Sequence, residues 1–319
     1  MLTWVLGLAG MGLLFAGGEL SVRGSVSLAR RLSLPPLLIG IVIVGFMTSM
    51  PELVVSLQAI MAGNPVLAVG NVVGSDIVNI LLVLGIATLI APIAAGQVCA
   101  RRDAIVMTAA LAAITAFAAF GTIEHWQGFL MVASLVAYVA WSYRSGSTRS
   151  TPEARLHIAD AAEAACLPPA EPIWLIIVVL IGGLGSLVVG ATWVVTAATE
   201  IARSMGLSEA AIGLTVVSLG TTLPELSAAI ASARHGHSEL VIGNVLGSNI
   251  FNALGVLGLC ALVTPVPMER LFVVLDLPLL ILISFALMPV LAGRRDLRRR
   301  AGAVMLVAYV AYFVLRFLV

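Results

Sequence analysis

The sequence contains no lysine, so its 17 basic side chains other than histidine are all arginines. Without lysine the chain cannot form the glycine-rich loop in which a lysine binds ATP phosphates, which excludes an ATPase of that class. Charged residues are also scarce, at 10% of the chain against about 25% in soluble domains. The net charge of +1 gives no reason to expect nucleic acid as a partner.

Cysteine is equally rare. Cys99, Cys166 and Cys260 have neither a metal-binding spacing nor the even number of a disulfide framework, so we interpret them as packing residues. The four histidines lie in or near predicted loops without a shared helix face, and none is expected to bind a metal. No catalytic or cofactor-binding residue is predicted, and we do not expect an enzyme.

Hydrophobic residues, in contrast, make up 61% of the chain, which is typical of an integral protein of the lipid bilayer. Residues 1–20 lack the basic start of a signal peptide and form a longer apolar run, so they predict a first transmembrane helix. At about 20 residues per span, the apolar runs predict ten helices, at 3–28, 36–62, 67–90, 104–121, 125–143, 173–202, 209–234, 240–263, 271–291 and 302–318.

An offset of 173 residues superimposes two of these apolar regions. Residues 48–53, TSMPEL, match residues 221–226, TTLPEL, and residues 70–75, GNVVGS, match residues 243–248, GNVLGS. From Pro36 to Gly85, 20 of the 50 positions are identical without a gap. Shared apolar composition does not align Pro-Glu, Gly-Asn and Gly-Ser at a single offset, so the chain contains an internal duplication.

A polar connection divides the ten predicted helices into two sets of five. Residues 1–143 form the first repeat and 173–319 the second, and the linker 144–172 carries Ser, Thr, Pro and mixed charge, with a helical part expected at 152–166. Because five is odd, the second set enters the membrane in the opposite orientation. The predicted fold is therefore all-α, with two inverted five-helix repeats and broken helices at a central site.

The arginines predict the orientation of this fold. Short loops rich in basic residues stay in the cytoplasm. Thirteen arginines fall in predicted loops on one side of the membrane and three in loops on the other. This distribution predicts a cytoplasmic linker, with both termini outside.

Each duplicated segment places a proline, Pro51 or Pro224, inside a predicted helix. Proline lacks the backbone donor and disrupts the preceding turn, so both helices are expected to break and to free carbonyls around 45–48 and 218–221. Free carbonyls at membrane depth need a cavity or a partner, and a hard cation is such a partner because it prefers oxygen ligands.

Each segment also contains a carboxylate, Glu52 or Glu225. An ionisable group at mid-membrane costs about 2.5 kcal/mol or more and normally marks an ion or substrate path. No arginine in the predicted spans lies near either motif, so a cation from solution is the expected counterion. A four-residue spacing brings polar side chains onto one helix face, in the pairs Thr48/Glu52, Ser75/Asn79, Thr221/Glu225 and Ser248/Asn252.

Other polar residues have simpler explanations. Asn71 and its copy could join helices through interhelical hydrogen bonds worth about 0.6 kcal/mol each. Glu19 and Arg23, four residues apart, are expected to pair within the first helix. Asp103 and Asp276, equivalent under the offset, fall at predicted helix starts and are expected to cap them.

The paired TSxPE-like and GNxxGSxxxN segments resemble the calcium/cation antiporter superfamily, specifically prokaryotic sodium/calcium exchangers, over essentially the whole chain. The resemblance implies a central row of Na⁺ and Ca²⁺ sites, contributions from the carbonyls of Gly45 and Ser218, and first and sixth helices that slide past the remaining core. The side chains it places around these ions are Thr48, Ser49, Glu52, Ser75 and Asn79, with Thr221, Thr222, Glu225, Ser248 and Asn252.

Three positions depart from this pattern. Met47 stands where the second repeat has Gly220 and the family commonly has glycine, so the first broken helix is expected to bend differently. Asn252 occupies a position that is aspartate in some sodium/calcium exchangers. Asp76 replaces the asparagine expected from its copy Asn249, and either restores a charge to the site or hydrogen-bonds to a neighbouring helix; we favour the charge.

The predicted function is a Na⁺/Ca²⁺ antiporter of a prokaryotic inner (plasma) membrane, with Glu52 and Glu225 as shared ligands. Two negative charges balance one Ca²⁺, and exclusive occupancy by Na⁺ or Ca²⁺ gives exchange. A proton/Ca²⁺ antiporter on the same fold is the close alternative, since neighbouring carboxylates can carry protons. A gated cation channel is an alternative from another class, and the oligomeric state is left open.

Overall fold

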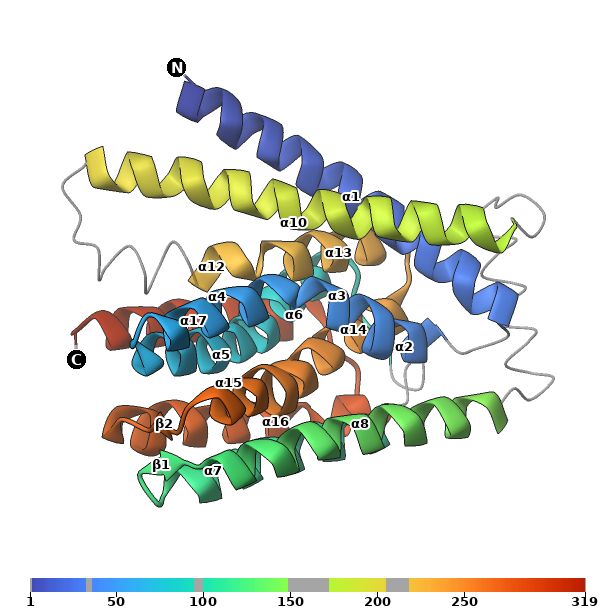
Figure 1. Cartoon of the computed structure of the whole chain (residues 1–319). Coiled ribbons are helices and arrows are strands. Elements are labelled where there is room, and N and C mark those ends of the chain that lie inside the picture. Colours follow the sequence, from blue (N-terminus) through green and yellow to red (C-terminus); the bar gives the residue numbers. More distant parts are fainter. Residues whose placement is uncertain (1, 33–35, 95–99, 149–171, 205–217, 319) are drawn as a thin grey trace.

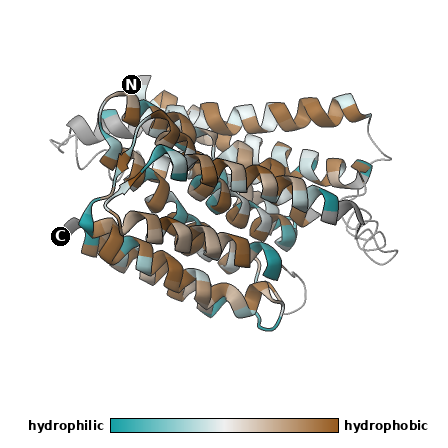
Figure 2. Cartoon of the chain, turned by 60° about the horizontal axis from the view of Figure 1, so that its bottom comes forward, coloured by the Kyte–Doolittle hydropathy of each residue, from teal (hydrophilic) through white to brown (hydrophobic). Residues whose placement is uncertain are grey.

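The computed structural model describes residues 2–32, 36–94, 100–148, 172–204 and 218–318, and almost all of them are helical (Figure 1). Lipid offers backbone groups no hydrogen bonds, so an apolar chain satisfies them within helices. Figure 2 shows hydrophobic residues along the helices and hydrophilic ones mainly towards their ends. Six segments are long and apolar enough to cross a membrane: Thr3–Ala29, Leu37–Met61, Pro65–Ile90, Ile173–Val194, Ser238–Val263 and Phe272–Leu291. The chain is a multi-pass membrane protein.

The first half begins with the long helix α1 and continues with two interrupted helices and two continuous ones. The second helical segment is divided into three α-helical pieces by a π-helical turn, η1, and by a break at Ser49. The third contains a second π-helical turn, η2. The elements are α1 (Leu2–Leu32), α2 (Pro36–Ile39), η1 (Gly40–Val44), α3 (Gly45–Thr48), α4 (Met50–Met61), α5 (Pro65–Val78), η2 (Asn79–Val83), α6 (Leu84–Ile90), α7 (Arg101–Ala118), β1 (Thr122–Ile123) and α8 (His125–Thr148).

The second half repeats this order. Its long first helix is followed by a helix broken at Thr222 and by one with a π-helical turn at the position equivalent to η2. The elements are α10 (Ile173–Ser204), α12 (Ser218–Thr221), α13 (Leu223–Arg234), α14 (Ser238–Ile250), η4 (Phe251–Val256), α15 (Leu257–Val263), β2 (Val266–Pro267), η5 (Phe272–Asp276), α16 (Leu277–Leu291) and α17 (Arg299–Leu318).

These elements confirm the predicted all-helical membrane class, with differences at the ends of helices. α1 runs beyond the expected end at residue 28, and α8 continues to Thr148, into the segment predicted as linker, because no proline or left-handed glycine stops it. The predicted helix 209–234 is described only from residue 218, and the helix expected at 152–166 lies outside the described residues. The two-residue strands β1 and β2 were not predicted.

The helices α1 and α10 lie side by side along one side of the other helices (Figure 1). Glycines permit the close contact: a Cβ on Gly10 would lie 2.8 Å from the Gly190 carbonyl oxygen, and one on Gly17 would lie 2.7 Å from that of Gly183. Under the 173-residue offset Gly10 corresponds to Gly183 and Gly17 to Gly190. The two halves therefore contribute the same surface to this contact.

Two short clasps between the halves also correspond to one another. β1 pairs with β2, bringing Ile123 opposite Val266, and an isolated bridge joins Ile93 to Leu297. Ile93 and Val266 differ by 173 residues, and Ile123 and Leu297 by 174. The first clasp follows the end of α7 and the second precedes its start. Each half is thus held to the other at both ends of α7.

Asp103 and Asp276 do not cap helices as expected. Both are buried, and each accepts a hydrogen bond at 2.9 Å from a tyrosine of the next helix, Tyr138 or Tyr312. Arg102 also donates to Asp103, at 2.8 Å. A buried carboxylate needs such partners, and both tyrosines come from another helix, Tyr138 from α8 and Tyr312 from α17.

Candidate cation site between the two halves

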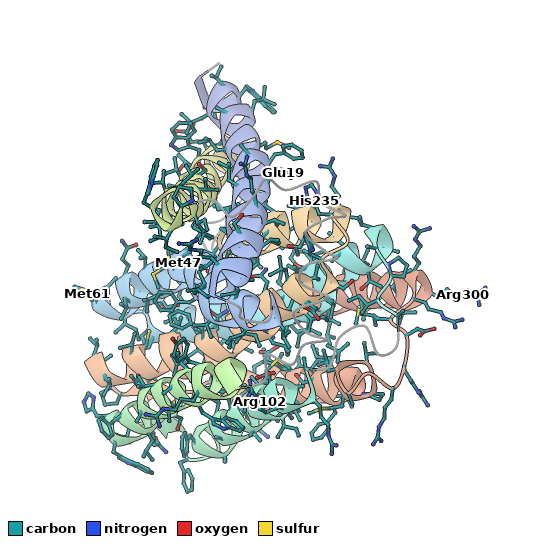
Figure 3. The ribbon with its side chains drawn as sticks, turned by 90° about the vertical axis from the view of Figure 1, so that its right-hand side faces the viewer. Glu19, Met47, Met61, Arg102, His235 and Arg300 are labelled. Carbon is teal, nitrogen blue, oxygen red and sulfur yellow. The ribbon has the colours of Figure 1, made fainter. Side chains whose placement is uncertain are left out.

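Each half interrupts a helix two residues before its Pro-Glu pair. Ser49, between α3 and α4, has φ −81° and ψ 6°, and Thr222, between α12 and α13, has φ −85° and ψ 0°. A new helix begins at the next residue, with proline in its first turn, where the missing N–H costs no hydrogen bond. The backbone is almost the same at both breaks, so Met47 does not change the bend as expected. Its side chain packs instead on the apolar cluster of α1 and α10 (Figure 3).

The two breaks place Glu52 and Glu225 in the first turns of α4 and α13, where the helix N-terminus stabilises negative charge. Both residues have 0% of their surface exposed. Serine hydroxyls donate to one oxygen of each carboxylate: Ser75 to Glu52 Oε1 at 3.4 Å, and Ser49 and Ser248 to Glu225 Oε1 at 3.2 and 3.4 Å. Because Ser49 belongs to the first half, the Glu225 carboxylate is bound across the boundary between the halves.

Asn71 and Asn244 join the two halves at the same level. Each donates its amide to the backbone carbonyl of the glutamate of its own half, at 3.2 Å. Each also accepts a hydrogen bond at 3.2 Å from the other half, Asn71 from Thr221 and Asn244 from Thr48. Both asparagine amides therefore make the interhelical hydrogen bonds that were considered for them. These bonds also fix the backbone at Glu52 and Glu225. In the sequence, both asparagines are marked by the Gly-Asn pair that recurs at the 173-residue offset.

The remaining hydroxyls meet across the same boundary. Thr48 lies 3.3 Å from Ser248, and Thr222 donates to Ser75 at 3.3 Å. The carboxylate, amide and hydroxyl side chains of this boundary are all buried, and the most exposed of them, Thr221, is 5% exposed. The boundary between the halves is thus lined with oxygen atoms inside an otherwise apolar core.

The carbonyl of Gly45 is not bare, although the proline break was expected to free it. It accepts the N–H of Ser49 at 3.2 Å, and the hydroxyls of Thr48 and Ser248, each 3.3 Å away, have it within reach as an alternative acceptor. The chain re-forms a helical bond across the break, and hydroxyls from both halves converge on the same oxygen. Ser218, its predicted counterpart, is the first residue of α12.

One turn further along, four side chains form a second set of contacts between the halves. Asn252 donates its amide to Asp76 Oδ1 at 3.1 Å, and Asn79 donates its amide to Asn249 Oδ1 at 3.0 Å. Asn249 in turn donates to the backbone carbonyl of Asp76 at 3.3 Å. Asp76 thus has the hydrogen bond to a neighbouring helix that was one of its two expected roles. Asn249, which the sequence indicated only as a copy, belongs to the same network.

Four oxygens of the site are buried and have no hydrogen-bond donor among the described residues: Glu52 Oε2, Glu225 Oε2, Asn79 Oδ1 and Asn252 Oδ1. They form two pairs of equivalent atoms under the 173-residue offset, and all four are acceptors. Burying an unpaired acceptor costs about 1–3 kcal/mol, and more when it is charged. A cation that binds these oxygens removes that cost. A hydrogen-bond donor would also remove it, but no described side chain donates to them.

The charge of the two carboxylates is not balanced from within the described chain. The ion pairs of the described residues involve Asp103, Glu19, Asp296 and Asp276 but neither Glu52 nor Glu225. Nor do any three His, Cys, Asp or Glu side chains of these residues converge on one possible metal position. The site therefore offers two carboxylates among neutral oxygens, a donor set suited to hard cations such as Na⁺ and Ca²⁺ rather than to thiophilic metals.

Comparison with known proteins agrees with this donor set. The chain is 33% identical to the putative antiporter CaxA of Alkalimonas amylolytica, over 97% of both chains. It is 34% identical to the inner membrane protein YrbG of Escherichia coli, over 90% of this chain and 89% of that protein. A solved structure of the sodium-calcium exchanger NCX_Mj, soaked with Na⁺ and Ca²⁺, superimposes with a TM-score of 0.84 at 28% identity, over 98% of both chains.

The sodium/calcium exchanger protein family matches residues 2–144 and 175–318. Both matched segments contain one broken helix, one buried glutamate and one asparagine with an unpaired oxygen. The chain is a membrane transporter rather than an enzyme, and it belongs to the sodium/calcium exchanger family.

Proposed function

We propose that the protein is a secondary antiporter that exchanges Na⁺ for Ca²⁺ across a prokaryotic inner membrane. Glu52 and Glu225 are the shared ligands, and neutral oxygens of both halves complete the coordination. Ca²⁺ neutralises the two carboxylates together, and Na⁺ ions replace it, so the two cations compete for the same oxygens. Hydroxyl and amide oxygens suit Na⁺ because a monovalent ion needs neutral ligands as well as charge.

The observation that carries this proposal is the set of four buried acceptors without donors, two on the glutamates and two on Asn79 and Asn252. Most buried polar side-chain atoms in proteins have a hydrogen-bond partner, so a group of unpaired ones in one place needs an explanation. Four of them, related in pairs by the repeat and lying between the halves, are accounted for together by cations that enter from solution. Ser75 and Ser248 bind the glutamates and precede Asn79 and Asn252 by four residues on the same helix face, which supports a row of oxygens rather than a single cluster.

Alternating access, in this proposal, comes from movement of α1 and α10 relative to the other helices. The contact between this pair and the core is largely apolar, through a cluster of Leu14, Val44, Leu184, Leu187, Ala191 and Ala228. Apolar contacts are not directional, so the helix pair can shift along them. The contact of Glu19 in α1 with His235 is a polar one that such a shift would change. The close glycine contacts between α1 and α10 keep the pair together.

The topology that we propose has ten transmembrane helices in two inverted repeats, residues 1–143 and 173–319. The linker 144–172 is cytoplasmic and both termini are outside. This arrangement follows from five helices in each half and from the bias of arginines to one side. It is supported by the two equivalent clasps, which lie at opposite ends of α7. A reporter enzyme that is active only outside the cytoplasm, fused after Val319, is expected to be active and, fused within 149–171, to be inactive.

A proton/Ca²⁺ antiporter is the second candidate, favoured by the presence of two carboxylates in one water-poor site. Protons could replace Na⁺ as the returning ion because each carboxylate can carry one. The two candidates differ in whether a Na⁺ gradient alone drives Ca²⁺ movement.

The deciding experiment is ⁴⁵Ca²⁺ uptake into proteoliposomes that contain purified protein. We expect rapid uptake when Na⁺ is inside and absent outside, and little uptake when only a pH gradient is imposed. Liposomes loaded with K⁺ and liposomes without protein are the controls. Uptake driven by the pH gradient alone would assign the proton/Ca²⁺ reaction, and downhill Ca²⁺ flux without counterflow would assign a channel.

A further inference from the structure

The side-chain amides of Asn79 and Asn252 each have a nitrogen on one side and an oxygen on the other, and the two atoms have different surroundings. Each amide nitrogen donates to a residue of the other half, and each amide oxygen has no donor among the described residues. Each follows its serine, Ser75 or Ser248, by four residues and so continues the helix face that reaches the glutamates. An asparagine can turn its amide over with little change in shape. A reversed amide would place an NH₂ group, which repels cations, where the oxygen now lies.

The orientation of Asn79 is set by a backbone carbonyl two steps away. The carbonyl of Asp76 can only accept, so Asn249 must turn its NH₂ group towards it, at 3.3 Å. Asn249 then presents its oxygen to Asn79, which must donate its own NH₂ group, at 3.0 Å. The oxygen of Asn79 is left on the other side. Asn249 transmits the orientation without being a ligand itself.

In the other half the orientation of Asn252 is set in one step. A carboxylate oxygen of Asp76 accepts the NH₂ group of Asn252 at 3.1 Å, and the amide oxygen of Asn252 is left unpaired. Asp76 and Asn249 are equivalent under the 173-residue offset, yet one is an acid and the other an amide. Their common property is an acceptor oxygen held towards the asparagine of the opposite half.

We propose that Asp76 and Asn249 are positioning residues that hold the amide oxygens of Asn252 and Asn79 towards the cation path and thereby set cation affinity. This inference rests on the proposed function. It assigns to Asp76 a hydrogen-bonding role that an amide can fill, in place of a third ligand charge. Loss of the acceptor at either position frees one amide to reverse. Loss of the charge at position 76, with an acceptor kept, leaves the amide as it is.

The test compares Asp76→Asn with Asp76→Leu, which have similar volumes. Asp76→Asn keeps an acceptor, as Asn249 already does in the other half, and is expected to change the KM for Ca²⁺ by less than about threefold. Asp76→Leu removes the acceptor and is expected to raise the KM for Ca²⁺ by about 10- to 100-fold, the usual range for groups that orient metal ligands. The maximal rate is expected to change much less in both variants.

The matched control is the same pair of changes at Asp276, a buried aspartate bound by Tyr312 and Arg316 away from the ion path. Asp276→Leu is expected to lower the melting temperature while leaving the KM for Ca²⁺ near the parental value. The second measurement is the rise in melting temperature on adding Ca²⁺ or Sr²⁺ to purified protein in detergent. It reports binding without transport, through the preferential stabilisation of the bound folded state.

The possible outcomes test the positioning role of Asp76 and Asn249 separately from the proposed Na⁺/Ca²⁺ exchange. Equal losses of Ca²⁺ affinity in Asp76→Asn and Asp76→Leu would assign a charge role to Asp76 and overturn the proposal, as would parental affinity in Asp76→Leu. If Asp76→Leu does not fold, Asn249→Ala decides, with a raised KM expected and an unchanged KM contradicting the proposal. A parent protein that neither binds nor transports Ca²⁺ would refute the proposed function itself, before any variant is compared.

Discussion

The two halves of the molecule make several equivalent hydrogen bonds from residues that are not all the same. Thr48 and Thr221 each donate at 3.2 Å to the asparagine of the opposite half, and the backbone at Ser49 and Thr222 differs by only a few degrees. At positions 76 and 249 an acid and an amide make equivalent contacts. The comparison teaches that, at positions 76 and 249, the repeat preserves an acceptor towards the opposite half even though the side chain differs.

The halves also differ where α1 meets the core. Glu19 of α1 pairs with His235 at 2.5 Å and with Arg234 at 3.7 Å, both at the end of α13 (Figure 3). It was expected to pair within α1. The equivalent of Glu19 in α10 is Thr192, which donates to its own helix at Val188, 2.9 Å away. A perfectly symmetric antiporter would favour neither access state, so this ion pair is a contact through which one state can be favoured.

The largest effect that we expect comes from making the glutamates unequal. Glu52→Gln and Glu225→Gln each keep the volume and remove one charge. Each is expected to abolish Ca²⁺ transport, because a single carboxylate cannot neutralise a dehydrated divalent cation. The measurement is ⁴⁵Ca²⁺ uptake driven by internal Na⁺.

Folding serves as the control for these two variants. Neither is expected to lower the melting temperature much, since removing an unpaired buried charge also removes its desolvation cost. Near-parental Ca²⁺ exchange by either variant would contradict the shared-carboxylate site.

A second pair of changes examines the packing of the two halves. A Cβ on Gly128 would lie 2.8 Å from the Gly258 carbonyl oxygen, and one on Gly302 would lie 2.8 Å from that of Gly85. Gly128→Ala and Gly302→Ala must therefore push apart two backbones, and each is expected to cost about 1–3 kcal/mol of stability. Thermal unfolding in detergent measures both, with Gly12→Ala, which meets no atom within 4 Å, as the control. Clearly unequal costs would show that the two contacts are not equivalent.

A smaller effect is expected from Glu19→Gln. The ion pair is partly exposed, with 32% of the Glu19 side chain accessible, so its contribution to stability is expected to be below about 1 kcal/mol. Its removal is expected to change the ratio of forward to reverse Na⁺/Ca²⁺ exchange rates by at most about fivefold, the factor that corresponds to 1 kcal/mol. Thr192→Val in α10 is the matched control and is expected to leave the ratio unchanged. The same ratio in parent and Glu19→Gln would rule out a role in access.

The smallest effect concerns the loops that precede α5 and α14. Asn64 caps α5 by accepting the N–H of Leu67 at 3.3 Å, whereas its equivalent His237 makes no side-chain cap to α14. Burial, and secondarily the neighbouring His235, lowers the pKa of His237. The folded chain then holds this proton less tightly than the unfolded chain, so stability falls as pH decreases through the ordinary histidine pKa of about 6.5.

Replacement of His237 by asparagine, as in the first half, tests both features. His237→Asn is expected to add about 0.5–1 kcal/mol of stability through the new cap and to flatten the loss of stability below about pH 6.5. Melting temperatures between pH 5 and 8 measure this, with His125→Asn as the control. A variant with an unchanged pH dependence would show that another group is responsible.

Much of the site was readable from the sequence because the duplication marks it. The 173-residue offset predicted both broken helices, both glutamates and the serine, threonine and asparagine positions that lie between the halves. Proline and glutamate determine these features locally, through the missing N–H of Pro51 and Pro224 and the cost of a carboxylate in lipid. The family resemblance rests on the same residues, and the family match confirms it.

What the sequence could not determine is which partners these side chains find. The Gly45 carbonyl was expected to be free, yet hydroxyls from both halves reach it. Asp103 was expected to cap a helix, yet it binds Tyr138. Thr48 is close to Gly45 in the sequence, but Ser248 lies in the other half and Tyr138 lies 35 residues from Asp103. The packing of helices therefore selects these distant partners.

The sequence by itself determined that this is a membrane protein with two copies of an oxygen-rich motif, because composition and spacing act locally. Only the tertiary structure decided that Asp76 faces Asn252, that Asn249 faces Asn79 and that four acceptor oxygens remain unpaired. The reason is that a hydrogen bond depends on distance and direction between atoms that the chain brings together only when its two halves are packed against each other.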